Sequence, residues 1–221
     1  MKRHRREKPD YGMGRTGIVA LIGVLLVAAL GISLINALRS EDSGTVGLGD
    51  WGIGRKVPPF AVPDVRSDLD GDANVDRGEA CSVRVEGAIT VCDYRGRPLV
   101  VSFWFTRGAA ACVDYQDDFD RVYRRFSDRA GFLSINVRDD RDSVGEIVAE
   151  RGWQVDVAHD RDGALSNLYR VGGCPTFLFI DGKGVLRRSE AGETDYRTLS
   201  GQVRSFLDGQ EVGRKVQQEE G

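Results

Sequence analysis

The chain has 221 residues, a formal net charge of −3, and 41% hydrophobic and 29% charged residues. This composition is ordinary for a globular protein of one or two domains, and the small negative charge argues against a nucleic-acid partner. Charge is unevenly distributed, because basic side chains crowd the N-terminal segment 1–16: Lys2, Arg3, Arg5, Arg6, Lys8 and Arg15.

Residues 17–38 contain no charged side chain. A hydrocarbon core of about 30 Å needs about 20 helical residues, so this run predicts one transmembrane helix. The basic segment 1–16 should stay in the cytoplasm, which places the rest of the chain on the extracytoplasmic side of the cell membrane. A buried core helix would need a polar face, and a cleaved signal peptide has a shorter apolar region, so an uncleaved anchor fits better.

Residues 39–56 are rich in Gly, Ser and Asp and predict a flexible stalk. An ordered domain should follow over 57–208, with an acidic insert at 66–80, and a polar tail over 209–221. Within the domain, apolar patterning predicts alternating strands and helices, ending in a hairpin and an amphipathic helix. The expected elements are strands 99–105, 132–137, 154–157, 176–181 and 185–190 and helices 143–151, 164–169 and 194–207, with a further helix before 132 whose apolar stripe runs from Tyr115 to Phe126. This order predicts an α/β fold with a mixed central sheet and helices on both faces.

The acidic insert has side-chain oxygens at the spacing of a calcium-binding loop: Asp68, Asp70, Asp72, Asp76 and Glu79. Ala73 stands where glycine makes the sharp turn of such loops, and flanking helices are not evident. A solvated acidic loop is the alternative interpretation of the same residues.

Four cysteines lie on the predicted extracytoplasmic side, where disulfides persist. Cys81 and Cys92 flank a segment whose alternation suggests a hairpin, so we expect a structural disulfide between them. Zinc is a poor interpretation, because no Cys-x-x-Cys spacing occurs and His159 is the only histidine of this part. Cys112 stands near the start of a predicted helix, where free N–H groups and the helix dipole favour a thiolate.

Pro175 precedes a predicted core strand, which suggests a cis peptide bond after Cys174. Together with the segments 57–63, 93–106 and 160–186, this feature resembles the membrane-anchored thioredoxin-like family that includes TlpA-type disulfide reductases and redoxin domains. The resemblance covers about 57–207 and implies the thioredoxin-like fold. The usual W-C-x-x-C motif is altered, because Cys112 matches its second cysteine and Ala109 takes the place of the first.

The resemblance also implies that the residue before the cis-proline packs against the active-site cysteine. Cys112 and Cys174, beside Pro175, would then form a replacement redox pair; a static disulfide or two unpaired thiols are the alternatives. We expect a membrane-tethered thiol–disulfide oxidoreductase that acts on protein thiols or disulfides and needs no cofactor. A catalytically degenerate binding or scaffold module and a thiol peroxidase remain the competing functions.

Overall fold

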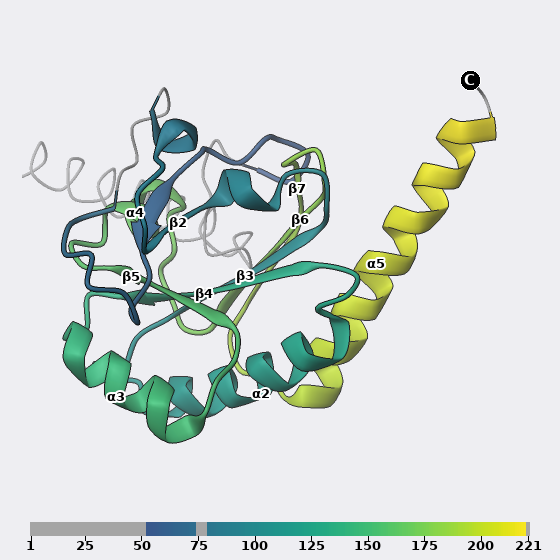
Figure 1. Cartoon of the computed structure of the whole chain (residues 1–221). Helices are drawn as coiled ribbons and strands as arrows, with labels where there is room; N and C mark the ends of the chain where they lie inside the picture. Colours follow the sequence, from purple (N-terminus) through teal and green to yellow (C-terminus); the bar gives the residue numbers. More distant parts are fainter. Residues whose placement is uncertain (1–51, 74–78, 220–221) are drawn as a thin grey trace, which may run out of the picture. The chain divides into compact units, whose positions relative to one another are not determined.

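The structure, a computed structural model, describes residues 52–73 and 79–219. At the centre of this part is a five-stranded sheet in the order β5-β4-β3-β6-β7 (Figure 1). β3, β4 and β5 run parallel, whereas β6 is antiparallel to β3 and β7 to β6. The strands are β3 (Leu99–Trp104), β4 (Gly131–Val137), β5 (Asp156–Asp160), β6 (Thr176–Ile180) and β7 (Leu186–Ala191).

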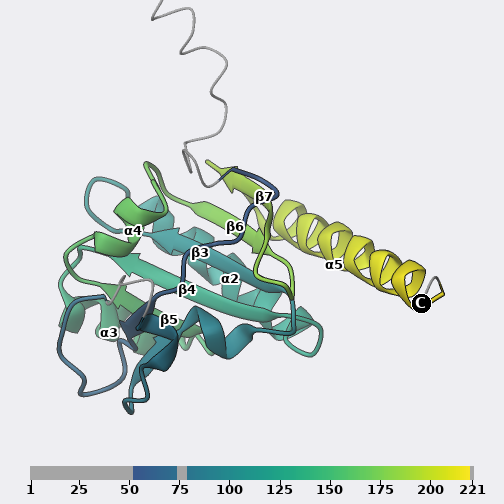
Figure 2. The ribbon, with the colours of Figure 1, turned by 90° about the horizontal axis from the view of Figure 1, so that it is seen from above.

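Helices cover both faces of this sheet, which confirms the predicted α/β class with a mixed sheet (Figures 1 and 2). One face carries α2 (Ala111–Phe126), α3 (Arg141–Arg151) and α5 (Tyr196–Glu219). The other carries α4 (Ala164–Leu168) and a small antiparallel sheet of β1 (Ala61–Pro63) and β2 (Ala88–Thr90). Two short 3-10 helices flank β2 in the sequence: η2 (Ala80–Ser82) and η3 (Val91–Tyr94).

The alternation of side chains along β3 divides the core into two halves. Val100 and Trp104 pack with the helices α2, α3 and α5, whereas Leu99, Val101 and Phe103 pack with α4 and β1. All five are at most 2% exposed. Because successive side chains of a strand point to opposite faces, a strand buried on both faces needs the continuous apolar run seen here.

Two predicted boundaries were wrong. The third parallel strand begins at Asp156 and not at Gln154, because the N–H groups of Gln154 and Val155 donate to the buried carboxylate of Asp120, at 2.6 and 3.0 Å. The helix predicted over 143–151 begins at Arg141 and is capped by Asp140, whose carboxylate accepts from the N–H of Ser143. In both places an aspartate captures backbone donors near the end of a regular element.

The last helix also differs from its predicted range. It begins at Tyr196, after Asp195 accepts a hydrogen bond from the N–H of Thr198, and it continues to Glu219, well into the predicted polar tail. The predicted cytoplasmic segment 1–16, the predicted span 17–38 and most of the predicted stalk lie outside the described residues. None of the helices within 52–73 and 79–219 combines the length and apolarity that crossing a membrane requires.

We predict that Phe119→Ala destabilises the domain by about 3–5 kcal/mol, because it empties a fully buried site between α2, β4 and β6. Chemical denaturation of the chain would measure the change in the free energy of unfolding. Val85→Ala is the matched control, since Val85 is 53% exposed and its loss should cost less than about 0.5 kcal/mol. Equal effects of the two substitutions would contradict this description of the core.

Candidate active site

Cys112 occupies the first turn of α2, directly after the loop that leaves β3. Its N–H donates to the carbonyl of Ala109 at 2.8 Å, and its side chain is buried, at 2% exposure. Cys112 begins the inward-facing stripe of α2, which continues through Gln116 and Phe119 at helical spacing. The burial of Cys112 therefore follows from the same periodicity that attaches the helix to the sheet.

Cys174 lies just before β6, at the end of the sheet where β3 ends and the loop to α2 begins. The Cys174–Pro175 peptide bond is cis, and β6 begins at Thr176, which pairs with Phe103 near the end of β3. Cys174 is half-buried and packs against the core on the α2 side of the sheet. The antiparallel pairing of β6 with β3 thus brings the beginning of one strand beside the end of the other.

Cys112 and Cys174 form a disulfide, with their Cα atoms 6.1 Å apart across 62 residues of sequence. Ala109, which takes the place of the missing cysteine, lies in the turn just before α2 and is hydrogen-bonded to Cys112. Two sulfurs therefore meet at the N-terminal end of α2 through tertiary contact. A disulfide at this position is chemically able to exchange with an external thiol wherever one sulfur is accessible.

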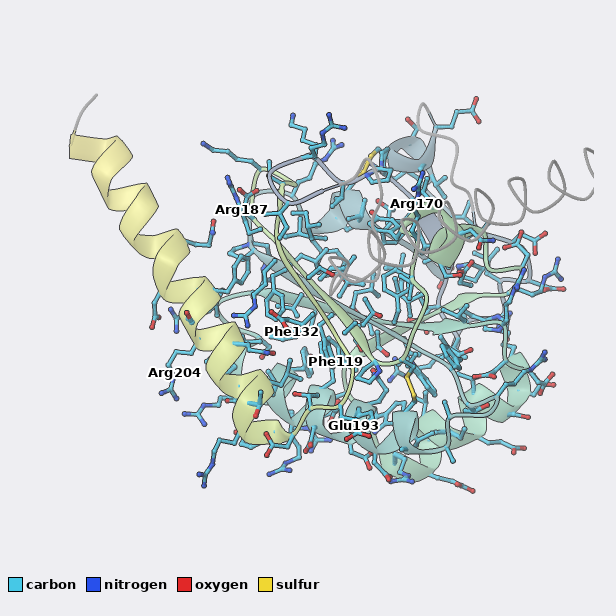
Figure 3. The ribbon with its side chains drawn as sticks, turned by 180° about the vertical axis from the view of Figure 1, so that it is seen from behind. Phe119, Phe132, Arg170, Arg187, Glu193 and Arg204 are labelled. Carbon is cyan, nitrogen blue, oxygen red and sulfur yellow. A yellow bond between two sulfur atoms is a disulfide. The ribbon has the colours of Figure 1, made fainter. Side chains whose placement is uncertain are left out.

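Cys81 and Cys92 form a second disulfide, with Cα atoms 5.5 Å apart. The hairpin predicted between them is not formed, because β2 pairs with β1 and the two cysteines lie in the 3-10 helices η2 and η3. The N-terminus of η3 is fixed by a capping box. The carboxylate of Asp93 accepts from the N–H of Thr90, and the hydroxyl of Thr90 accepts from the N–H of Cys92. Figure 3 shows the two disulfides as separate yellow bonds within the described domain.

Calcium binding by the acidic insert stays a prediction, because residues 74–78 lie outside the described part of the chain. The guanidinium of Arg161 lies 3.5 Å from a carboxylate oxygen of Asp70 and donates a 2.7 Å hydrogen bond to one of Asp72. This hydrogen bond holds the pKa of the Asp72 carboxyl below its ordinary value. Asp76 lies outside the described residues, and no cluster of three or more potential metal ligands occurs in the part that the structure describes. The two carboxylates are thus used in ion pairs with Arg161.

A buried polar network that the sequence reasoning missed lies beneath the first turn of α2. Gln116, one helical turn after Cys112, donates to the hydroxyl of Ser102 at 2.8 Å and accepts from Ser134 at 2.9 Å. All three side chains are at most 1% exposed. The sequence signal was a polar residue in the middle of each of two apolar strands, but only the register of β3 with β4 places Ser102 opposite Ser134.

Asp139 was also missed. It follows β4, and its carboxylate accepts a 2.7 Å hydrogen bond from the N–H of Thr106 in the loop before α2. Asn136 donates to the same oxygen, and the ring of His159 contacts the Asp139 carbonyl at 2.9 Å. A carboxylate directly after a parallel strand is a recognisable signal, since functional groups gather at the carboxyl ends of such strands.

The fold and the cysteine pair beside a cis-proline define this domain as thioredoxin-like. More particularly, the chain belongs to the AhpC/TSA family, whose pattern matches residues 53–189. It is 28% identical to the thiol:disulfide interchange protein DsbE of Pseudomonas fluorescens over 146 residues, which are 65% of this chain and 68% of that protein. It is 24% identical to the thiol-disulfide oxidoreductase ResA of Geobacillus thermodenitrificans over 170 residues, 76% of this chain and 82% of that protein.

Solved structures share the fold. A DsbF homologue from Corynebacterium diphtheriae superposes with a TM-score of 0.55 at 18% identity, covering 69% of this chain and 87% of its own. A thioredoxin-family thiol:disulfide interchange protein from Chlorobium tepidum superposes with a TM-score of 0.53 at 17% identity, covering 71% of this chain and 98% of its own. At these identities the likeness concerns the fold.

We predict that replacing Cys81 and Cys92 together by serine lowers the stability of the domain by about 2–3 kcal/mol, because the unfolded chain loses a short cross-linked loop. Denaturant titration of the variant would measure this change. The Cys112–Cys174 disulfide should form as before, which peptide mapping under non-reducing conditions would verify. A rearranged pairing of Cys112 or Cys174 in that variant would contradict the assignment of two independent disulfides.

Proposed function

We propose that this protein is a thiol–disulfide oxidoreductase whose redox-active pair is Cys112 and Cys174. The observation that carries the proposal is the disulfide between the N-terminal turn of α2 and the residue before Pro175. Two relatives of the chain are named for thiol–disulfide chemistry, which supports the same class of reaction. The substrates would be protein thiols or disulfides, and the chemistry needs no cofactor beyond the two sulfurs.

The exposure of the two cysteines assigns them different roles in this proposal. Cys112 is buried, whereas Cys174 is half-buried and stands in the loop between α4 and β6. An incoming thiolate needs access along the S–S axis, so it attacks the Sγ of Cys174, and the electron pair of the broken bond leaves on the Sγ of Cys112. The positive end of the α2 helix dipole favours that leaving thiolate.

The full cycle balances two electrons. A second substrate thiolate attacks the substrate sulfur of the mixed disulfide and releases Cys174, so the substrate becomes a disulfide and the protein holds two thiols. In the reverse direction the Cys174 thiolate attacks a substrate disulfide, and Cys112 then attacks Cys174 to release the reduced substrate. Cys112 was predicted to be the reactive thiol; in the proposed cycle Cys112 is the resolving thiol and Cys174 contacts the substrate.

The same proposal includes the location of the domain. The uncharged run 17–38 after a basic N-terminal segment is long enough to span a membrane, and the disulfides at Cys81–Cys92 and Cys112–Cys174 suit an oxidising compartment. We therefore place the redox domain on the extracytoplasmic side of the cell membrane, tethered by one helix, where exported proteins supply its thiol or disulfide substrates.

The roles of the two cysteines predict which single variant traps an intermediate. With oxidised glutathione as the probe, Cys112→Ser should accumulate a mixed disulfide at Cys174, because the resolving thiol is absent. Cys174→Ser should form at least about tenfold less adduct in the same time, since the remaining thiol at Cys112 is buried. Intact-mass measurement with peptide mapping would quantify both adducts.

Two results would contradict this prediction in different ways. Adduct formation chiefly on Cys112 in the Cys174→Ser variant would reverse the roles and keep the redox function. Adduct formation on Cys174 no faster than on a free cysteine would remove the catalytic interpretation and leave a binding or scaffold module, the function that Ala109 in place of a cysteine favours.

The tether predicts that the full chain sediments with the membrane fraction and resists extraction by high salt or carbonate. Deletion of residues 17–38 should release the protein into the soluble fraction with its disulfides no longer formed in the cytoplasm. Protease added to intact spheroplasts should digest the redox domain of the full chain. Protection of the domain from that protease would contradict the proposed orientation.

A further inference from the structure

Asp139 is a buried carboxylate that holds the loop leading to Cys112. Its side chain is only 4% exposed, although it lies just beyond the C-terminal end of β4. One oxygen, Oδ2, accepts hydrogen bonds from the N–H of Thr106 at 2.7 Å and from the side chain of Asn136 at 2.8 Å. The chain turns toward this position through Arg138, whose φ of 62° is uncommon for a residue other than glycine.

A series of backbone hydrogen bonds connects this carboxylate to the redox pair. The N–H of Thr106 donates to Asp139, the carbonyl of Thr106 accepts from the N–H of Ala109 at 3.1 Å, and the carbonyl of Ala109 accepts from the N–H of Cys112 at 2.8 Å. Gly108, at φ 72°, allows the tight turn within this loop. The carboxylate therefore begins a continuous hydrogen-bonded path that ends at the backbone of Cys112.

The shape of this contact does not require a negative charge. An asparagine has one carbonyl oxygen in the same place, and that oxygen has two lone pairs for the two donors, Thr106 and Asn136. The carboxylate instead buries a second oxygen, Oδ1, that makes no hydrogen bond within the described part of the chain. This oxygen faces the guanidinium of Arg107 at 3.9 Å, so its partner is a charge and not a hydrogen-bond donor.

We propose that Asp139 is a positioning residue whose charge sets the reduction potential of the Cys112–Cys174 pair. The inference rests on the proposed redox function. A negative charge hydrogen-bonded to the loop before Cys112 opposes formation of a thiolate, whereas the N-terminal end of α2 favours it. By disfavouring the thiolate, Asp139 makes the reduced pair less stable and the protein a stronger reductant.

Three other charged or titratable groups face this site. The Nε of Arg107 lies 3.9 Å from Oδ1 of Asp139, but its side chain is 75% exposed, so solvent and salt weaken its effect. The ring of His159 contacts the carbonyl of Asp139 and not its carboxylate. Asp140 is turned to the N-terminus of α3, where its bonds to Ser143 hold the pKa of its carboxyl below its ordinary value. Asp139 is thus a buried charge held against the loop before Cys112, and Arg107, on that loop, is its exposed counter-charge.

The test is the equilibrium of the full chain with a glutathione redox buffer, measured for Asp139→Asn. The substitution keeps the shape and the hydrogen bonds and removes the charge, so the equilibrium constant for reduction of the pair should rise about tenfold, which is a rise of about 30 mV in reduction potential. Asp181→Asn is the matched control. The Asp181 carboxylate is also 4% exposed and accepts backbone hydrogen bonds. It lies in the β6–β7 hairpin, at the opposite end of β6 from Cys174. Its substitution should leave the constant within about twofold.

Arg107→Gln keeps the test decisive if Asp139→Asn destabilises the fold, because an exposed side chain is replaced. Removing the counter-charge should shift the constant in the opposite direction, by about twofold, and the shift should shrink at high salt. An unchanged constant in Asp139→Asn, or a shift of the same sign in both variants, would overturn the proposal.

A second measurement separates this inference from the proposed function. After reduction with a phosphine, iodoacetamide should alkylate the Asp139→Asn pair about threefold faster than the parent pair at pH 7, because alkylation reports thiolate formation without any exchange reaction. If the parent protein fails to exchange with glutathione but the alkylation difference persists, the proposed function fails and the role of Asp139 stands. Normal exchange with no difference between Asp139→Asn and Asp181→Asn in either measurement overturns the role of Asp139 alone.

Discussion

The packing of α2 across the central sheet is the contact on which the site depends. Phe119 lies 5.7 Å from the ring of Phe132 on β4 and 5.8 Å from that of Phe177 on β6, the two strands that flank β3. In Figure 3, Phe119 and Phe132 lie together in the interior of the domain. Held in this way, the first turn of α2 stays at the end of the sheet where β6 begins, so Cys112 stays beside Cys174. The Cys112–Cys174 disulfide therefore depends on aromatic packing two turns further along the helix.

A pair formed in this way behaves differently from two cysteines one helical turn apart. Cysteines in one turn remain close whenever the helix forms, whereas Cys112 and Cys174 are separated by 62 residues and meet only in the folded domain. Closing a loop of that length in an unfolded chain costs conformational entropy, so the stability of the disulfide and the stability of the fold support each other. The opposing influences of the α2 N-terminus and of Asp139 then act on a pair that the fold itself holds in place.

Much of the architecture was predictable because it depends on local patterns. The run 99–105 is too apolar and too short for anything but a buried strand, and the stripe from Tyr115 to Phe126 has helical spacing. Predictions went wrong where one aspartate competed with a regular element, as Asp120 did for the backbone of Gln154. The expected hairpin between Cys81 and Cys92 failed for a related reason, since alternation alone does not say which strand β2 will choose as its partner.

A mixed sheet with helices on both faces could be predicted from the residue pattern, because apolar periodicity is a property of neighbouring residues. The sequence also marked Cys112, Cys174 and Pro175 as the residues of interest. The bond between the two sulfurs, the burial of Cys112 and the contact of Asp139 with the loop before it arise from the folded arrangement alone. Each of these depends on strand order and register, which bring together residues that have no relation along the chain.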